Sequence, residues 1–122
     1  SLKRDFIAQH YLVGGEWGRE NELNSHHYEV EVIIEGSKLD EHGFLVDIVD
    51  IQTHLTDMIS KYRDSTLNDF AEFHGINPSI EHFSRILCQT MADYIGASDL
   101  DYITVRIYED VEAWASYKIE LR

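Results

Sequence analysis

Apolar and polar residues alternate along four parts of this chain, and a period of two predicts a β-strand in each of them. In the first run, Phe6, Ala8 and His10 fall on one face of the predicted strand. Polar stretches that contain glycine separate the runs and predict turns and loops, among them a long loop over residues 13–24. The four predicted strands cover residues 3–12, 25–35, 103–109 and 113–121.

Two central segments instead carry apolar residues three and four positions apart, which is the spacing of an α-helix. The first helix is expected to begin at about Asp50, which we assign as its N-cap residue, and its apolar positions are Ile51, Leu55, Met58, Ile59 and Tyr62. The second helix is expected to begin near Asn77-Pro78-Ser79 and to end at Gly96. Its apolar stripe is made of Ile80, Phe83, Ile86, Leu87, Met91 and Ile95.

The element order ββααββ predicts an α+β fold in which a four-stranded antiparallel sheet carries both helices on one face. The length of 122 residues suits one domain over residues 1–122 with its own core. A sheet of this kind has two free edges, and unprotected edges favour association with other chains. We therefore expect a homo-oligomer in which several sheets close into a barrel.

The charge of the chain excludes some classes of partner. The formal net charge is −13, and the ten lysines and arginines are scattered along the sequence. Phosphate backbones and anionic lipid surfaces are bound by clustered cations, so we expect neither nucleic acid nor a membrane as a partner.

The expected compartment is the cytoplasm. No stretch is long and apolar enough to span a bilayer, and the charged N-terminal residues lead directly into a strand, so we expect no signal peptide. Cys88 is the single cysteine, which excludes an internal disulfide. It lies in an apolar helical run, where we expect it to be buried and unreactive.

The first two strands carry a candidate metal site. Asn24 and His26 share one face of the second strand, and His10 ends the alternating run of the first. If these strands are neighbours, His10 and His26 converge near Asn24. Two imidazoles and one further nitrogen or oxygen donor form a transition-metal site with an open position. The alternative is that these are ordinary polar residues of exposed strands.

Several short motifs follow one another in a recognisable order. They are Phe6-Ile7-Ala8-Gln9-His10, Asn24-Ser25-His26-His27-Tyr28, Gly43 with Leu45-Val46 and Asp47, Leu67-Asn68-Asp69, Pro78-Ser79-Ile80-Glu81, and Glu109 at a strand end. From about Phe6 to Tyr117, the chain resembles the 6-pyruvoyl-tetrahydropterin synthase / 6-carboxy-tetrahydropterin synthase family.

The resemblance implies the tunnelling fold (T-fold), in which trimers close a β-barrel and two barrels stack into a hexamer with active sites at subunit interfaces. It also implies a zinc ion, held in that family by three histidines, that grips the side-chain hydroxyls of a reduced pterin. By position, the metal ligands of this chain would be His10, Asn24 and His26. Glu109 would anchor the pterin ring.

This chain departs from the family pattern at its catalytic positions. Asn24 replaces a histidine, and an amide oxygen is a weaker ligand for zinc, so another transition metal is possible. Glu20 stands where the family has a cysteine; it is either the general base, as in a family subgroup that cleaves the pterin side chain, or an ordinary loop carboxylate. Arg63 and Asp64 replace an aspartate–histidine pair. Asp64 is a candidate proton acceptor, and Arg63 pairs either with an anionic substrate or with Asp64.

The sequence thus favours a metal-dependent, pterin-processing lyase that acts on a dihydroneopterin-type substrate with altered catalytic residues. Two alternatives remain open. One is a non-catalytic oligomeric module that binds a pterin or purine, because the cysteine and the aspartate–histidine pair are absent. The other is a structural oligomer that reuses the barrel.

Overall fold

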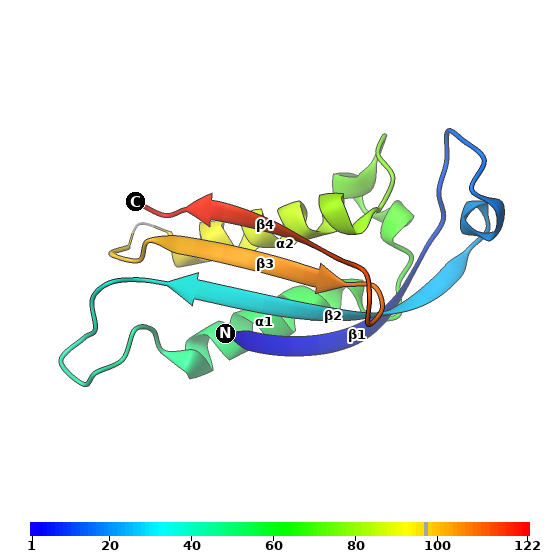
Figure 1. Cartoon of the computed structure of the whole chain (residues 1–122). Coiled ribbons are helices and arrows are strands. Elements are labelled where there is room, and N and C mark those ends of the chain that lie inside the picture. Colours follow the sequence, from blue (N-terminus) through cyan, green and yellow to red (C-terminus); the bar gives the residue numbers. More distant parts are fainter. Residues whose placement is uncertain (97) are drawn as a thin grey trace.

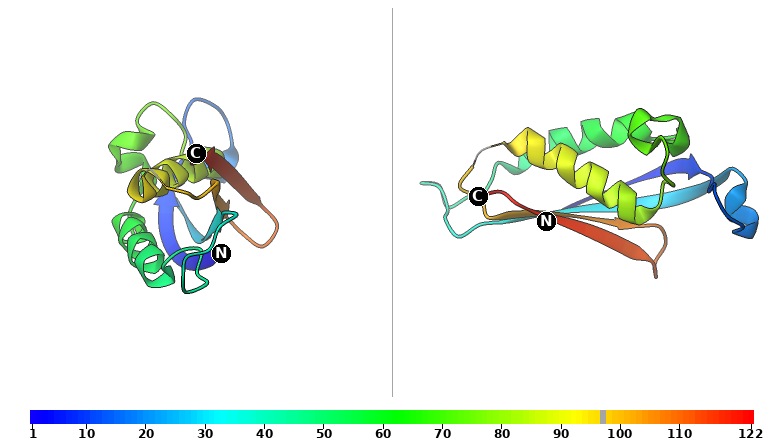
Figure 2. Two further views of the ribbon diagram at one scale, coloured as in Figure 1. Left: turned by 90° about the vertical axis from the view of Figure 1, so that its left-hand side faces the viewer. Right: turned by 90° about the horizontal axis from the view of Figure 1, so that it is seen from above.

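Four antiparallel strands form one sheet in the order β1-β2-β3-β4 in the computed structural model, which describes residues 1–96 and 98–122. The two long helices lie side by side on one face of this sheet and leave its other face uncovered (Figures 1 and 2). The elements are β1 (Leu2–His10), β2 (Asn24–Glu35), α1 (Ile48–Tyr62), α2 (Ile80–Ile95), β3 (Tyr102–Tyr108) and β4 (Trp114–Glu120), with short 3-10 helices η1 (Gly18–Asn21), η2 (Leu67–Asp69) and η3 (Ala71–Phe73). The predicted α+β arrangement is confirmed.

An aromatic cluster joins the sheet to the helices. Phe83 of α2 meets Phe6, Tyr28, Tyr62 and Phe73 edge-on, with ring centroids 5.9, 5.5, 5.2 and 5.6 Å away. All five side chains are buried. Edge-to-face aromatic pairs add about 0.5–1.5 kcal/mol each beyond the burial of their surface. The cluster therefore holds the inner face of β1 and β2 rigidly against α2.

The first helix begins earlier than predicted. Asp47 is the N-cap residue, because its side chain accepts hydrogen bonds from the backbone nitrogens of Val49 at 3.0 Å and Asp50 at 3.4 Å. The assignment of Asp50 as the cap was wrong; Asp50 lies in the first turn, and its carboxylate accepts from the Tyr94 hydroxyl at 2.8 Å. Helix α2 begins at Ile80, next to the predicted start, and Ser79 is its N-cap residue.

Cys88 is buried in the core, as expected from its place in an apolar helical run. Burial raises the pKa of its thiol to about 11, which keeps it unreactive near neutral pH. Among residues 1–96 and 98–122, neither long helix has the length and apolar character needed to cross a bilayer.

Strand register places the candidate residues at one end of the sheet. His10 lies opposite Asn24, and Ala8 lies opposite His26. At the same end, β3 stops at Tyr108, and Glu109 continues the inward-facing row of that strand by one residue. The loop between β1 and β2 projects beyond this end, at the right of Figure 1.

Candidate metal centre

Two histidines and two glutamates from four separate segments meet at this end of the sheet. His10 ends β1, His26 lies near the start of β2, Glu20 belongs to η1, and Glu109 follows β3. Glu20 Oε2 lies 3.1 Å from His10 Nε2 and 3.8 Å from His26 Nε2. Glu109 Oε1 lies 3.3 Å from His26 Nε2 and 4.0 Å from His10 Nε2. Two imidazole nitrogens and two carboxylate oxygens therefore face one another.

The spacing of these donor atoms fits a divalent transition metal. The ligating atoms of His10, His26 and Glu109 all lie within 4.8 Å of one another. Donors bound to one ion at about 2.1 Å are about 3–4 Å apart, which is the range found for the nitrogen–oxygen pairs. His26 Nε2 is buried and makes no hydrogen bond to any residue that the structure describes, although the Glu109 carboxylate is 3.3 Å away. A buried, unpaired nitrogen that faces a carboxylate is available to bind a cation.

Tyr28 supports the far side of the His10 ring. Tyr28 Oη lies 3.1 Å from His10 Nδ1, and both side chains are buried. Burial raises the pKa of the Tyr28 phenol well above its ordinary value, so the hydroxyl keeps its proton. With a metal on His10 Nε2, Nδ1 would carry the ring proton, and this N–H would donate a hydrogen bond to Tyr28 Oη. This bond would fix both the tautomer and the plane of the ring.

Asn24 ties the two strands together next to the cluster. Its Nδ2 donates to the backbone oxygen of His10 at 3.1 Å and to that of Glu22 at 2.9 Å. Its Oδ1 is buried and has no partner among residues 1–96 and 98–122. Strand alternation puts Asn24 on the same face as His26, so this oxygen is a further candidate ligand.

Asparagine side chains, rather than a neighbouring strand, hold the backbone that follows His10. Asn68 accepts from the Tyr11 nitrogen at 3.0 Å and donates to the Tyr11 oxygen at 2.9 Å. Asn77 makes the same two bonds with Val13, at 2.8 and 3.1 Å. Alternation predicted a strand as far as residue 12. The strand ends at His10, where its pairing with β2 stops at Asn24. The backbone groups of Tyr11 and Val13 instead continue the outer edge of β1, on which Ile7 and Gln9 bind residues 64 and 65.

Asn21 organises the turn that carries Glu20. Its Nδ2 donates to the backbone oxygens of Leu12 at 3.0 Å and Gly15 at 2.9 Å, and its Oδ1 accepts from the Trp17 nitrogen at 2.7 Å. The backbone oxygen of Glu20 accepts a hydrogen bond from the backbone nitrogen of Leu12 at 2.7 Å. The backbone of Glu20 is thus fixed, while its side chain is 41% exposed and accessible to a ligand.

Asp64, the second predicted catalytic residue, lies apart from Glu20. Its backbone nitrogen donates to the Ile7 oxygen at 2.7 Å, which places it at the outer edge of β1. The side chains of Asp64 and Arg63 are exposed. Among the described residues, the group of potential metal ligands consists of His10, His26 and Glu109 and does not include Asp64.

Sequence reasoning did not assign the supporting residues Tyr28, Asn68 and Asn77. For Tyr28 a local signal existed, because it follows His26 by two residues and so shares its face. The two asparagines have no local signal, because they lie 57 and 64 residues from the backbone groups that they bind.

Comparison with known proteins places the chain in a family. Residues 1–120 match the family described as 6-pyruvoyl tetrahydropterin synthase, so the chain belongs to that family. A putative 6-carboxy-5,6,7,8-tetrahydropterin synthase of Archaeoglobus fulgidus is 24% identical over 96% of this chain and 92% of the relative.

Solved structures of the family share the fold. The 6-pyruvoyl tetrahydropterin synthase of Caenorhabditis elegans superposes with a TM-score of 0.80 at 18% identity, over 98% of this chain and 94% of that one. A Plasmodium vivax 6-pyruvoyltetrahydropterin synthase, in which alanine replaces a catalytic glutamate, gives a TM-score of 0.75 at 12% identity, over 98% and 99% of the two chains.

Proposed function

We propose that this member of the 6-pyruvoyl tetrahydropterin synthase family is a metal-dependent lyase that processes a dihydroneopterin-type pterin. The observation that carries the proposal is the meeting of two imidazoles and two carboxylates at one end of the sheet. Buried imidazole pairs with adjacent carboxylates are typical of sites that bind metals and transfer protons.

His10 and His26 would hold the metal, with Asn24 Oδ1 as the third donor. Zinc is the first candidate, and another transition metal is the alternative. The buried, unpaired His26 Nε2 and Asn24 Oδ1 support this set. When bound, the metal would polarise oxygen atoms on the pterin side chain.

Glu109 would anchor the pterin ring. A pterin presents an N–H and an amino group side by side, and one carboxylate can accept both hydrogen bonds. Because Glu109 Oε1 lies 3.3 Å from His26 Nε2, Glu109 could instead replace Asn24 as the third metal ligand. The two assignments differ in an observable way. Glu109→Gln weakens pterin binding by the metal-free protein in the first case and weakens metal binding in the second.

Glu20 would be the general base that removes a proton from a side-chain hydroxyl of the substrate. Its position 3.1 Å from His10 and its partial exposure support this role. In the Plasmodium vivax relative a glutamate is a catalytic residue, which agrees with a glutamate in this role. Asp64, exposed at the outer edge of β1, would assist proton transfer in the site of a neighbouring subunit.

The chain would work as a homo-hexamer made of two trimers. The outer edge of β4 is free within the described residues, and the segment after α1 pairs with β1 only near Ile7 and Gln9. Free edges on both sides of one sheet suit closure into a barrel. One domain over residues 1–122 would build each subunit, and the cytoplasm stays the predicted compartment.

The test combines metal content with product analysis. The purified protein should contain about one transition metal per chain. It should convert dihydroneopterin, with zinc, iron or manganese present, into a product whose side chain is shortened or rearranged. Glu20→Gln should keep the metal and lose about a hundredfold or more in turnover. If the protein binds pterin but shows no turnover in any metal form, the lyase interpretation is wrong and the non-catalytic binding module takes its place.

A further inference from the structure

The loop that carries Glu20 receives little support from the core. Residues 13–19 and 21–23 are all exposed, and the loop projects beyond the end of the sheet (Figure 1). Loops of this kind are held by packing among their own side chains. The Glu20 carboxylate nevertheless has a defined place, 3.1 Å from His10 Nε2. Contacts inside the loop therefore decide where this carboxylate lies.

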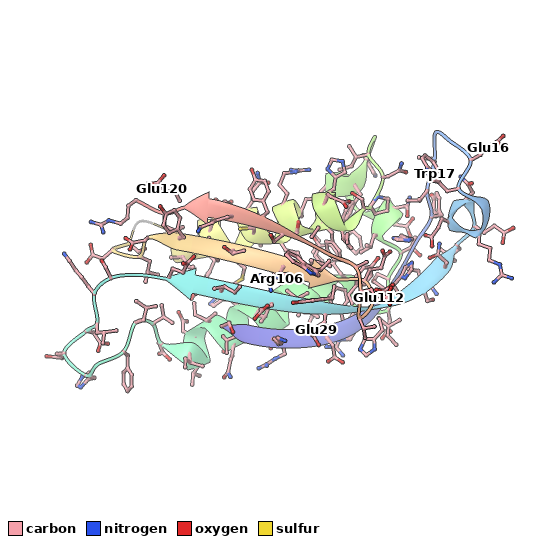
Figure 3. The ribbon with its side chains drawn as sticks, in the orientation of Figure 1. Glu16, Trp17, Glu29, Arg106, Glu112 and Glu120 are labelled. Carbon is pink, nitrogen blue, oxygen red and sulfur yellow. The ribbon has the colours of Figure 1, made fainter. Side chains whose placement is uncertain are left out.

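The ring of Trp17 makes an unusually close contact inside this loop. Trp17 is the only tryptophan, tyrosine or phenylalanine among residues 12–27, and Figure 3 shows it on the projecting loop. Its ring lies against Gly15, where an added β-carbon would be 2.6 Å from Trp17 Cη2 and 2.9 Å from Cζ2. Gly15 does not have a positive φ, so an alanine could adopt its backbone conformation. The close approach of the ring, and not the backbone, requires glycine at residue 15.

Backbone hydrogen bonds connect this contact to Glu20. Asn21 Nδ2 donates to the Gly15 oxygen at 2.9 Å, and Asn21 Oδ1 accepts from the Trp17 nitrogen at 2.7 Å. The Trp17 oxygen accepts from the Glu20 nitrogen at 3.3 Å. Trp17 thus contacts Gly15 through its ring and the turn of Glu20 through its backbone.

We propose that packing of the Trp17 ring on Gly15 positions the Glu20 carboxylate beside His10, so that Trp17 is a positioning residue for the general base. This inference rests on the proposed function, in which Glu20 removes a proton from the substrate. Hydrogen bonds in an exposed loop compete with water and stabilise it only modestly. The ring adds an apolar contact that only this loop conformation allows. Without it the loop gains alternative conformations, and Glu20 is beside His10 for less of the time.

Gly15→Ala tests the proposal, because the added methyl group displaces the Trp17 ring. The kcat for dihydroneopterin should fall at least about tenfold, since the base is misplaced. KM and metal content should stay unchanged, because Glu109 and the ligands of the metal are untouched. Trp17→Ala should have the same effect as Gly15→Ala. Full turnover in either variant would overturn the inference.

Gly15→Ala in the Trp17→Ala background is the matched control. The methyl group then meets no ring, so it should change kcat by less than about twofold relative to Trp17→Ala alone. An equal loss in both backgrounds would assign the effect to Gly15 itself and refute the role of the ring contact.

Two readouts do not depend on turnover. Arg19 is the only lysine or arginine among residues 5–37, so tryptic cleavage after Arg19 reports opening of this loop. Gly15→Ala should speed this cleavage at least about fivefold. In the metal-free protein at one pH, it should also move the ring-nitrogen NMR signals of His10 toward their positions in Glu20→Gln.

These readouts separate the inference from the proposed function. If the unaltered protein does not turn over dihydroneopterin, but Gly15→Ala opens the loop and moves the His10 signals, the proposed function fails and the positioning of Glu20 by Trp17 stands. If the cleavage rate and the His10 signals are unchanged in Gly15→Ala, the inference is overturned whatever the turnover.

Discussion

Removal of the Asn68 side chain tests whether the asparagine contacts position the metal centre. Asn68→Ala deletes two hydrogen bonds to Tyr11, 3.0 and 2.9 Å long. Each such bond contributes about 1 kcal/mol net, so the free energy of unfolding should fall by about 2 kcal/mol. Both residues are only partly buried. Water can therefore reach the freed backbone groups, and the larger cost of fully buried, unpaired groups does not arise.

The same change should weaken metal binding. Tyr11 follows His10 directly, so a loosened Tyr11 backbone lets the His10 ring shift relative to His26. Loss of a residue that supports a metal ligand typically costs 10- to 100-fold in affinity, and we expect about tenfold because His10 keeps its bond to Tyr28. Urea unfolding measures the stability, and competition with a chromophoric chelator measures the metal affinity.

Asn77 offers a matched control. Asn77→Ala removes the same pair of bonds from Val13, farther along the chain from His10. It should lower stability by a similar or slightly smaller amount, because Val13 is exposed, and change metal affinity by less than about threefold. The reasoning is refuted if Asn68→Ala costs less than about 0.5 kcal/mol, or if both variants weaken metal binding equally.

Three further changes probe the same region. Tyr28→Phe removes the hydroxyl beside His10 Nδ1 and should lower metal affinity about tenfold with an unchanged circular dichroism spectrum; full affinity would contradict the supporting role. Asn24→His should raise zinc affinity at least about tenfold in the chelator assay, because imidazole is a better zinc ligand than an amide; a fall would mean that the amide's backbone bonds matter more. The Asp5 carboxyl has a pKa below its usual 3.8 because His27 donates to it, so its stabilising contribution is present above that pH and is lost as the pH falls through the lowered value. Asp5→Asn should therefore flatten the acid limb of stability against pH, and an unchanged limb would exclude this contribution.

The spacing of apolar residues was enough to predict the strands and helices, because one face of each element is buried in the same core. The N-cap of α1 shows the limit of this reasoning. Asp47 and Asp50 both precede apolar helical positions, and both residue types are good caps. The choice depends on a contact 44 residues away, where the Tyr94 hydroxyl binds the Asp50 carboxylate. The local sequence around Asp50 does not indicate that Tyr94 will be its partner.

The candidate site also has a part that local patterns predict and a part that depends on long-range contacts. Alternation and the pairing of neighbouring strands were sufficient to predict that His10 and His26 lie together, because β1 and β2 are adjacent in the chain and in the sheet. The approach of Glu109 to His26 depends on β3 pairing with β2 and ending at the same end of the sheet. That register is a long-range property, and residue 109 by itself predicted only a carboxylate at a strand end.

Under the proposed function, Asn24, Glu20 and Glu109 would act as a coupled set. Three imidazoles leave both charges of a divalent ion uncancelled, and such an ion strongly acidifies a bound hydroxyl or water. Under the proposed function, Asn24 would supply a neutral oxygen donor in place of a third imidazole. Glu20 and Glu109 bring two carboxylates within 3.1 and 3.3 Å of the histidine nitrogens. A bound ion would be nearly neutralised and would acidify a hydroxyl less. Proton removal would then depend on a nearby base, and the partly exposed Glu20 occupies the position from which it can act as one. Under the proposed function, Glu20 would thus both weaken the electrophile and supply the base that compensates for it.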